Sequence, residues 1–214
     1  YMLNAWSWYV IINDGQDGHR VGYWRVFKYT VTGYALNYVT PVGVLGGEPY
    51  RIMELTPYVG AAKASSSVIL YAMMHICSHF CFWLISIVWA VFALQDMTSD
   101  HWLGLLVSLL VISALLILFW KLYCNGIMLQ FMRRWVDWPL LNPNLLPANV
   151  FCQSLGYELL SRLVNVCEYW LIMQVMGFDT FGYGDAFLVV AFSSLFANVL
   201  FFSPLQMGTR EGGI

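Results

Sequence analysis

Long apolar segments separated by short polar loops dominate the sequence. Residues 64–95, 101–122 and 150–176 are each long enough to cross a bilayer as a helix, which takes about 20 apolar residues. Residues 29–40 and 186–203 are also apolar, but each ends at a proline that glycines follow closely. Because proline removes a backbone donor and glycine loosens the chain, no continuous helix is expected through these breaks. The pattern predicts an all-α polytopic integral membrane protein.

The composition supports a membrane location. Hydrophobic residues make up 60% of the chain and charged residues 10%, whereas soluble domains carry about 25% charged residues. The 10 tryptophans and 13 tyrosines are typical of side chains at membrane interfaces. The chain has no basic run or nucleic-acid-binding module, so we expect no nucleic-acid partner. Its five cysteines lie in or beside apolar segments, and an odd number does not indicate a disulfide framework.

The distribution of charge predicts how the chain crosses the membrane. The loops at 96–100 and 177–185 contain aspartate but no lysine or arginine, and the basic residues lie elsewhere: Arg20, Arg25, Lys28, Arg51, Lys63, Lys121, Arg133 and Arg134. Basic loops favour the cytoplasmic side, so residues 29–57 are expected to enter and leave from that side as a re-entrant element. A second re-entrant element, 186–214, then enters from the opposite side. We expect a multi-pass protein of the cell membrane, the cytoplasmic membrane of a bacterium.

The ends of the chain indicate a fragment. The sequence begins at Tyr1 inside an apolar aromatic segment and stops at Ile214, just after a glycine-rich break. We interpret residues 1–214 as a single membrane domain that is an internal part of a longer domain, with the second re-entrant element incomplete.

The two broken elements share a pattern. PVGVLGGEPYR at 41–51 and PLQMGTREGGI at 204–214 each place a glutamate seven positions after the proline, and each has an arginine close to that glutamate. The residues that mark the breaks are Pro41, Gly46, Gly47, Pro204 and Gly208. Opposite directions of entry predict an inverted repeat, in which broken helices meet near the midplane and line the substrate site. The alternative is that these prolines and glycines mark loop turns with solvated charges.

The pair TPVGVLGGEPYR and SPLQMGTREGG resembles the transmembrane, flippase-like domain of lysylphosphatidylglycerol synthases, found in the multiple peptide resistance factor and in stand-alone proteins. Asn37 before Pro41, the long helix after Arg51 and a turn at Gly177 support the resemblance. A Glu-Arg pair common in that family after the first element is absent, since the stretch reads SSSVILYAMMHICSH. The resemblance implies movement of a phospholipid or lipid-linked headgroup between leaflets. It does not imply aminoacyl transfer, which resides in a separate soluble domain.

Polar residues also occur within the apolar helices. Glu158, Arg162, Asn165 and Glu168 lie along one face of 150–176, with Glu158 and Arg162 spaced for an i,i+4 pair. They form a polar wall of the lipid path, with Arg162 meeting a phosphate, or a self-neutralising structural pair, or the amphipathic start of a helix that lies in the membrane interface. His75 and His79 alternate with Cys77 and Cys81, but the two pairs project about 200° apart on a helix. Packing between helices is therefore favoured over a metal site.

Together these patterns favour a lipid flippase-like protein, more a transporter than an enzyme, with no cofactor and no metal. Its partner is a membrane lipid: an anionic or aminoacylated phospholipid, or a polyprenyl-linked lipid. The expected substrate-binding residues are Glu48, Arg51, Arg210, Glu211, Asn37, Glu158 and Arg162. The arginines would engage phosphate, and Glu48 and Glu211 would bind a cationic headgroup or pair with the arginines. The alternative is a membrane component or enzyme of lipid or glycolipid biosynthesis whose catalytic part lies outside this chain. A synthase partner or a homo-oligomer fits either function.

Overall fold

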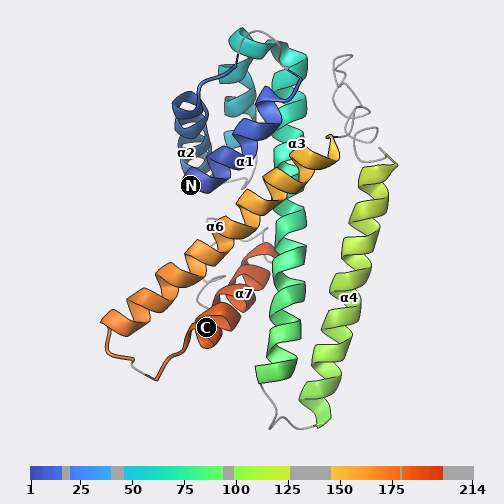
Figure 1. Cartoon of the computed structure of the whole chain (residues 1–214), viewed down its shortest axis with the longest axis vertical. Helices are drawn as coiled ribbons and strands as arrows, with labels where there is room; N and C mark the ends of the chain where they lie inside the picture. Colours follow the sequence, from blue (N-terminus) through green and yellow to red (C-terminus); the bar gives the residue numbers. More distant parts are fainter. Residues whose placement is uncertain (16–19, 40–45, 94–98, 126–145, 179, 200–214) are drawn as a thin grey trace. The chain divides into compact units, whose positions relative to one another are not determined.

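The computed structural model describes residues 1–15, 20–39, 46–93, 99–125, 146–178 and 180–199, and every regular element in them is an α-helix. The helices are α1 (Met2–Asn13), α2 (Tyr23–Val39), α3 (Gly47–Ala93), α4 (Ser99–Cys124), α6 (Ala148–Val175) and α7 (Tyr183–Val199) (Figure 1). The chain divides into two compact units. The first unit contains Tyr1–Cys77 and Phe119–Ser161, and the second contains Ser78–Leu118 and Arg162–Ile214. The expected all-helical class is confirmed for the described residues.

In the first unit, α2 and the beginning of α3 form an antiparallel helical pair. Three residue pairs join them, successively farther from the connection between the helices: Asn37 and Gly47, Tyr29 and Tyr50, and Arg25 and Tyr58. Figure 1 shows this first part of α3 beside α2, before the chain turns into the long remainder of α3. We call the pair, residues 23–59, the helical hairpin.

α3 is two helical segments joined at one glycine. Gly60 has φ 79° and ψ 156°, which lie outside the helical region and are accessible to glycine because it has no Cβ atom. Pro57, three residues earlier, has no N–H to donate to the preceding turn, which weakens the helix before the break. The helix expected at 64–95 corresponds to the second segment, which ends at Ala93.

α1 packs on α2 and reaches α6 through a pair of small side chains. Its buried face contains Ala5, Ser7, Trp8, Ile11 and Ile12. The hydroxyl groups of Ser7 and Ser154 lie 2.7 Å apart and are fully buried. Small hydroxyl residues allow two helices to approach closely and satisfy each other's hydrogen bonds, as in membrane helix pairs.

The second unit has its own apolar core, to which four helices contribute. The buried residues are Phe82, Trp83, Ile87, Ile112, Val166, Ala186, Phe187 and Ala191. The rings of Phe82 and Phe187 meet edge to face at 5.0 Å, and the indole N–H of Trp83 donates to Ser194 Oγ at 2.8 Å. These contacts hold the α7 helix against the later part of α3.

The connection between α6 and α7 is fixed by local hydrogen bonds. Gly177, with φ 90°, donates to Gln174 O at 3.0 Å, and Phe178 donates to Met173 O at 3.1 Å. This arrangement is a Schellman motif, which ends a helix at a glycine of positive φ. Asp185 then accepts from the Gly182 N–H at 2.8 Å and caps α7. The turn expected at Gly177 is therefore present.

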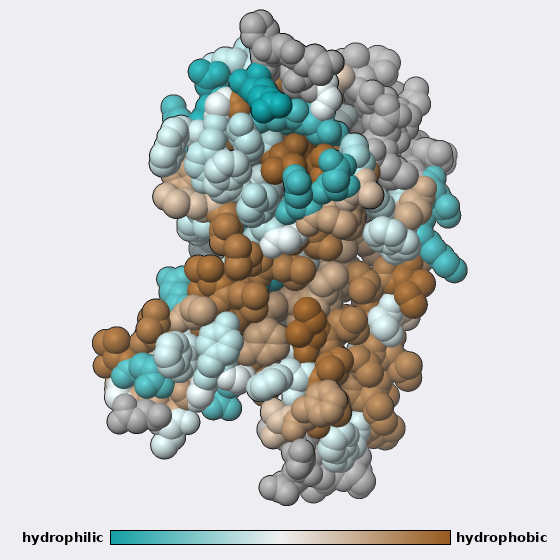
Figure 2. Space-filling view, in the orientation of Figure 1, coloured by the Kyte–Doolittle hydropathy of each residue, from teal (hydrophilic) through white to brown (hydrophobic). Residues whose placement is uncertain are grey.

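Within the described residues, two helices are long and apolar enough to cross a membrane. They are Gly47–Ala93, with mean hydropathy 2.0, and Trp102–Cys124 within α4, with mean hydropathy 2.8. Only 11% of the apolar window of α4 is buried within the protein, and Figure 2 shows a largely hydrophobic surface over this helix. Because large apolar side chains are costly to expose to water, this exposed apolar surface of α4 is suited to contact with lipid.

Candidate functional site

The tip of the helical hairpin is closed by one polar side chain. Asn37 Oδ1 accepts from the Gly47 N–H at 2.6 Å, and its amide donates to Glu48 Oε1 at 3.3 Å. Asn37 thus supplies a partner to one of the N–H groups that a helix start leaves unbonded. Gly47 is needed here because a Cβ atom would collide with the carbonyl oxygen of Gly33. The sequence therefore draws α2 and α3 into close backbone contact beside Glu48.

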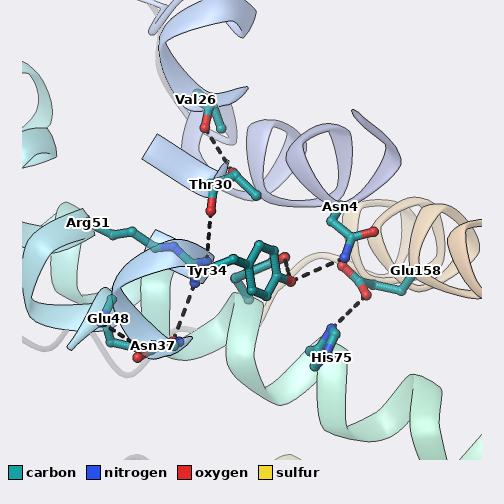
Figure 3. Close-up of polar contacts among 11 residues, drawn as sticks. Asn4, Val26, Thr30, Tyr34, Asn37, Glu48, Arg51, His75 and Glu158 are labelled. Atoms are coloured by element: carbon teal, nitrogen blue, oxygen red, sulfur yellow. Dashed lines mark hydrogen bonds and ion pairs between the residues drawn. The ribbon is translucent and has the colours of Figure 1, made fainter. Parts of the chain in front are cut away.

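Arg51 is buried one helical turn beyond Glu48. Only 2% of its side chain is exposed, and Nη2 donates to Thr30 O at 3.3 Å (Figure 3). Its guanidinium lies over the bare Cα atom of Gly33, where a Cβ atom would collide with Nε. Gly33 thus provides the space in which a large cation fits between the two arms of the hairpin.

Three aromatic rings surround the guanidinium carbon of Arg51. The centroids of Tyr34, Tyr71 and Trp8 lie 4.8, 5.5 and 5.6 Å from it. They come from α2, α3 and α1, so three helices contribute to the cage. A cation within about 6 Å of a ring face is attracted by the ring quadrupole, more strongly where water is excluded. We call Trp8, Tyr34 and Tyr71 the aromatic cage.

The charge of Arg51 is only partly balanced by a carboxylate. Glu48 Oε1 lies 3.4 Å from Nη1, and the Glu48 side chain is 25% exposed. Among the described residues, Arg51 Nε and Glu48 Oε2 are buried without a hydrogen-bond partner. Buried donors and acceptors left unpaired are costly, and they occur at sites that bind a further group. The pair therefore retains capacity to bind an additional polar ligand.

A chain of side-chain hydrogen bonds extends from the cage. The hydroxyls of Tyr34 and Tyr71 lie 2.7 Å apart, and Asn4 Nδ2 donates to the Tyr34 hydroxyl at 3.1 Å (Figure 3). The Ser161 hydroxyl in turn donates to Asn4 Oδ1. These contacts fix the ring orientations of the cage and connect α1, α2, α3 and α6.

Glu158 and Arg162 do not form the i,i+4 pair that their spacing predicted. Glu158 Oε2 lies 2.9 Å from His75 Nδ1, while Arg162 donates to Ser78 Oγ through Nε at 3.0 Å and Nη2 at 2.7 Å. A long side chain on one helix reaches a neighbouring helix as easily as the next turn of its own, so spacing alone did not determine the partner. Glu158 belongs to the first unit with Arg51, and Arg162 belongs to the second.

The structure thus brings together three of the expected site residues, Asn37, Glu48 and Arg51, with Gly47 at the same tip and Gly46 in the turn just before it. The expected residues Pro41, Pro204, Gly208, Arg210 and Glu211 lie outside the described residues. Sequence reasoning missed the aromatic cage, Asn4 and the role of His75 as partner of Glu158. Nothing in their spacing distinguishes them from ordinary apolar or interfacial side chains.

Comparison with known sequences places the chain in a family. The sequence model of the lysylphosphatidylglycerol synthase TM region matches residues 1–214, the whole chain. Neither curated proteins nor solved structures give a significant match. With two helices apolar enough to span a bilayer, the match identifies a membrane protein associated with lipids, in lipid metabolism or translocation. The chain belongs to the lysylphosphatidylglycerol synthase TM region family.

Proposed function

We propose that this chain moves a phospholipid or lipid-linked headgroup between leaflets, and that the site around Arg51 binds the headgroup. The observation that carries the proposal is a buried arginine, 2% exposed, in a membrane protein, whose Nε is unsatisfied and whose partner among the described carboxylates is Glu48. Ionisable groups at membrane depth are expensive and mark substrate pathways. The planar guanidinium matches the oxygens of a phosphate, which it binds through two parallel hydrogen bonds.

The helical hairpin has the dimensions of a re-entrant element. α2 contains 17 residues, or about 25 Å of helix, and the first segment of α3 is about 20 Å long. Neither arm spans the roughly 30 Å of the hydrocarbon core. Arg20, Arg25 and Lys63 flank the open end of the hairpin, which supports entry from the cytoplasmic side. Its tip, with Asn37 and Glu48, then lies at membrane depth.

The second broken element is proposed as the counterpart of the hairpin. α7 also contains 17 residues and precedes Pro204 as α2 precedes Pro41. In an inverted repeat, Arg210 and Glu211 would face the headgroup path from the non-cytoplasmic side as Arg51 and Glu48 do from the cytoplasmic side. We therefore propose a multi-pass protein of the cell membrane, in which the two elements form a single domain.

In this mechanism Glu48 exchanges partners. It holds Arg51 while no lipid is bound, at 3.4 Å. A phosphate that enters replaces Glu48 on the guanidinium, and the released carboxylate becomes available to an amine on the headgroup. Because the ion pair is replaced by an equivalent one, the headgroup passes without leaving Arg51 as an uncompensated buried charge.

A leaflet-exchange assay in proteoliposomes tests the proposal. Fluorescent phosphatidylglycerol, an aminoacylated phosphatidylglycerol and a polyprenyl phosphate serve as separate probes, with wild-type protein compared with Arg51→Gln, Glu48→Gln and Glu211→Gln. Glu54→Gln is the matched control, since Glu54 is exposed on the same arm as Glu48. We expect the three site variants to slow exchange at least tenfold and the control to leave it unchanged.

The same assay distinguishes the alternative. Exchange that is equal in wild type, Arg51→Gln and Glu48→Gln would remove this site from the mechanism. Wild-type protein that moves none of the probes, but yields a chemically altered lipid together with a synthase, would support a biosynthetic component instead.

A further inference from the structure

A buried acidic group lies in the first unit, on α6. The Glu158 side chain is 1% exposed, and its Oε2 lies 2.9 Å from His75 Nδ1. Among the described residues, its other oxygen, Oε1, is buried without a hydrogen-bond partner. Leaving one oxygen of a buried carboxylate unpaired costs free energy, so Oε1 has a free position for a hydrogen-bonding group or a proton. The His75 side chain, 33% exposed, gives the pair access to its surroundings.

The charge balance of the region favours a shared proton. Among the described residues of the first unit, the other buried charged side chain is Arg51, which pairs with the partly exposed Glu48. A buried carboxylate is costly unless a cation or a proton balances its charge. The pair is therefore neutral when one proton lies between His75 Nδ1 and Glu158 Oε2. A second proton, bound at Oε1, gives the pair a net charge of +1.

Contacts join this pair to Arg51. The ring of Tyr71 lies 6.3 Å from the ring of His75 and 5.5 Å from the guanidinium carbon of Arg51. Tyr71 and His75 are one turn apart on α3, so the Tyr71 ring lies between the His75 side chain and Arg51. A positive charge on the pair repels Arg51 across Tyr71, because a low-dielectric interior screens charges poorly.

We propose that Glu158, paired with His75, is a proton-binding site that couples proton movement to lipid movement. The coupling rests on the function proposed above, whereas proton binding does not. One proton from water on one side of the membrane binds at Glu158 Oε1, and the added charge weakens the hold of the aromatic cage on Arg51. After the site opens to the other side, the same proton leaves Oε1 for water. The pair returns to its one-proton state, so each cycle carries one proton.

Infrared difference spectroscopy of the purified full-length protein tests proton binding without any lipid transport. We expect a carbonyl band of a protonated carboxyl group to titrate with pH in wild type and to disappear in Glu158→Gln. His75→Gln should shift the pH at which the band titrates. Glu168→Gln is the matched control, because Glu168 is exposed on the same helix. A difference spectrum that is the same in wild type and Glu158→Gln overturns the proton site.

Leaflet exchange measured under an imposed pH gradient across the membrane tests whether proton movement drives lipid movement. One coupled proton and a gradient of about one pH unit should shift the steady-state lipid distribution by up to about tenfold. Glu158→Gln should abolish this shift, and Glu168→Gln should retain it. Wild-type exchange that is indifferent to the gradient overturns the coupling. Wild type that moves no lipid at all overturns the proposed function, while the infrared result still decides whether Glu158 binds a proton.

Discussion

The guanidinium of Arg51 occupies the space beside Gly33 that a larger residue at position 33 would need for its own side chain. The tight contact positions the cation inside the aromatic cage. It also makes the site sensitive to the addition of a single methyl group.

Gly33→Ala should displace Arg51 rather than separate the helices. The new Cβ atom would meet Nε, with Cζ at 3.0 Å and Nη2 at 3.1 Å, all near the end of a flexible side chain. We expect a loss of about 1–3 kcal/mol in the free energy of unfolding, measured by thermal unfolding in detergent, together with slower leaflet exchange. Gly156→Ala, with open space around its Cβ position, should be neutral or stabilising by up to about 1 kcal/mol. Equal losses in both variants would contradict the packing of Arg51 on Gly33.

Gly47→Ala should be more damaging than Gly33→Ala. Its Cβ atom would collide with the carbonyl oxygen of Gly33 and come within 2.8 Å of Asn37 Oδ1. A backbone carbonyl inside a helix has no freedom to swing aside, so the two arms must separate. We expect a loss of more than about 3 kcal/mol, measured in the same detergent. A smaller loss than that of Gly33→Ala would show that the arms are less closely packed.

Asn37→Asp should destabilise the tip, and Glu48→Gln should rescue it. The aspartate can still accept from the Gly47 N–H but loses the amide that donates to Glu48 at 3.3 Å. Two carboxylates then face each other, which we expect to cost about 1–2 kcal/mol. The double variant restores a donor in the pair and should recover most of the loss. Thermal unfolding of the four proteins forms a double-mutant cycle, and simple additivity would exclude the contact.

Two substitutions at Tyr71 should separate its hydroxyl from its ring. Tyr71→Phe removes the 2.7 Å hydrogen bond to Tyr34 and should cost about 1 kcal/mol. Tyr71→Leu also removes the ring that faces Arg51 at 5.5 Å, adding about 1–2 kcal/mol. The difference, measured by thermal unfolding, should shrink when Arg51 is replaced by glutamine. An unchanged difference would mean that the ring stabilises the fold by packing alone.

The hairpin tip could be predicted from the sequence because its contacts join residues that are near one another along the chain. Pro41, Gly46 and Gly47 predict where the helix fails, and Glu48 and Arg51 lie one turn apart directly after the break. Asn37 lies just before the break and Glu48 and Arg51 lie just after it, so the two arms of almost any helical hairpin would bring them together. Their placement at one site was therefore predictable, while their role in lipid binding stays a prediction.

The aromatic cage could not be predicted from the sequence in the same way. Trp8, Tyr34 and Tyr71 lie on three helices and resemble interfacial aromatic residues in every local property. Only the packing of α1 and α3 against α2 turns their faces toward one cation. His75 and Glu158, 83 residues apart, pose the same problem, because helical periodicity reveals neighbours on one helix and not partners across two.

Gly60, the residue of α3 with non-helical torsions, is the point at which the first segment of α3 can pivot. An arm about 20 Å long that pivots on the torsions of this residue acts as a lever, and a rotation of roughly 10° displaces its tip by about 3–4 Å. Glu48 and Arg51 lie on the segment before Gly60, whereas Tyr71 lies on the segment after it. Such a rotation would therefore change the 5.5 Å separation between the Arg51 guanidinium and the Tyr71 ring, while the helical torsions on both sides of Gly60 stay as they are.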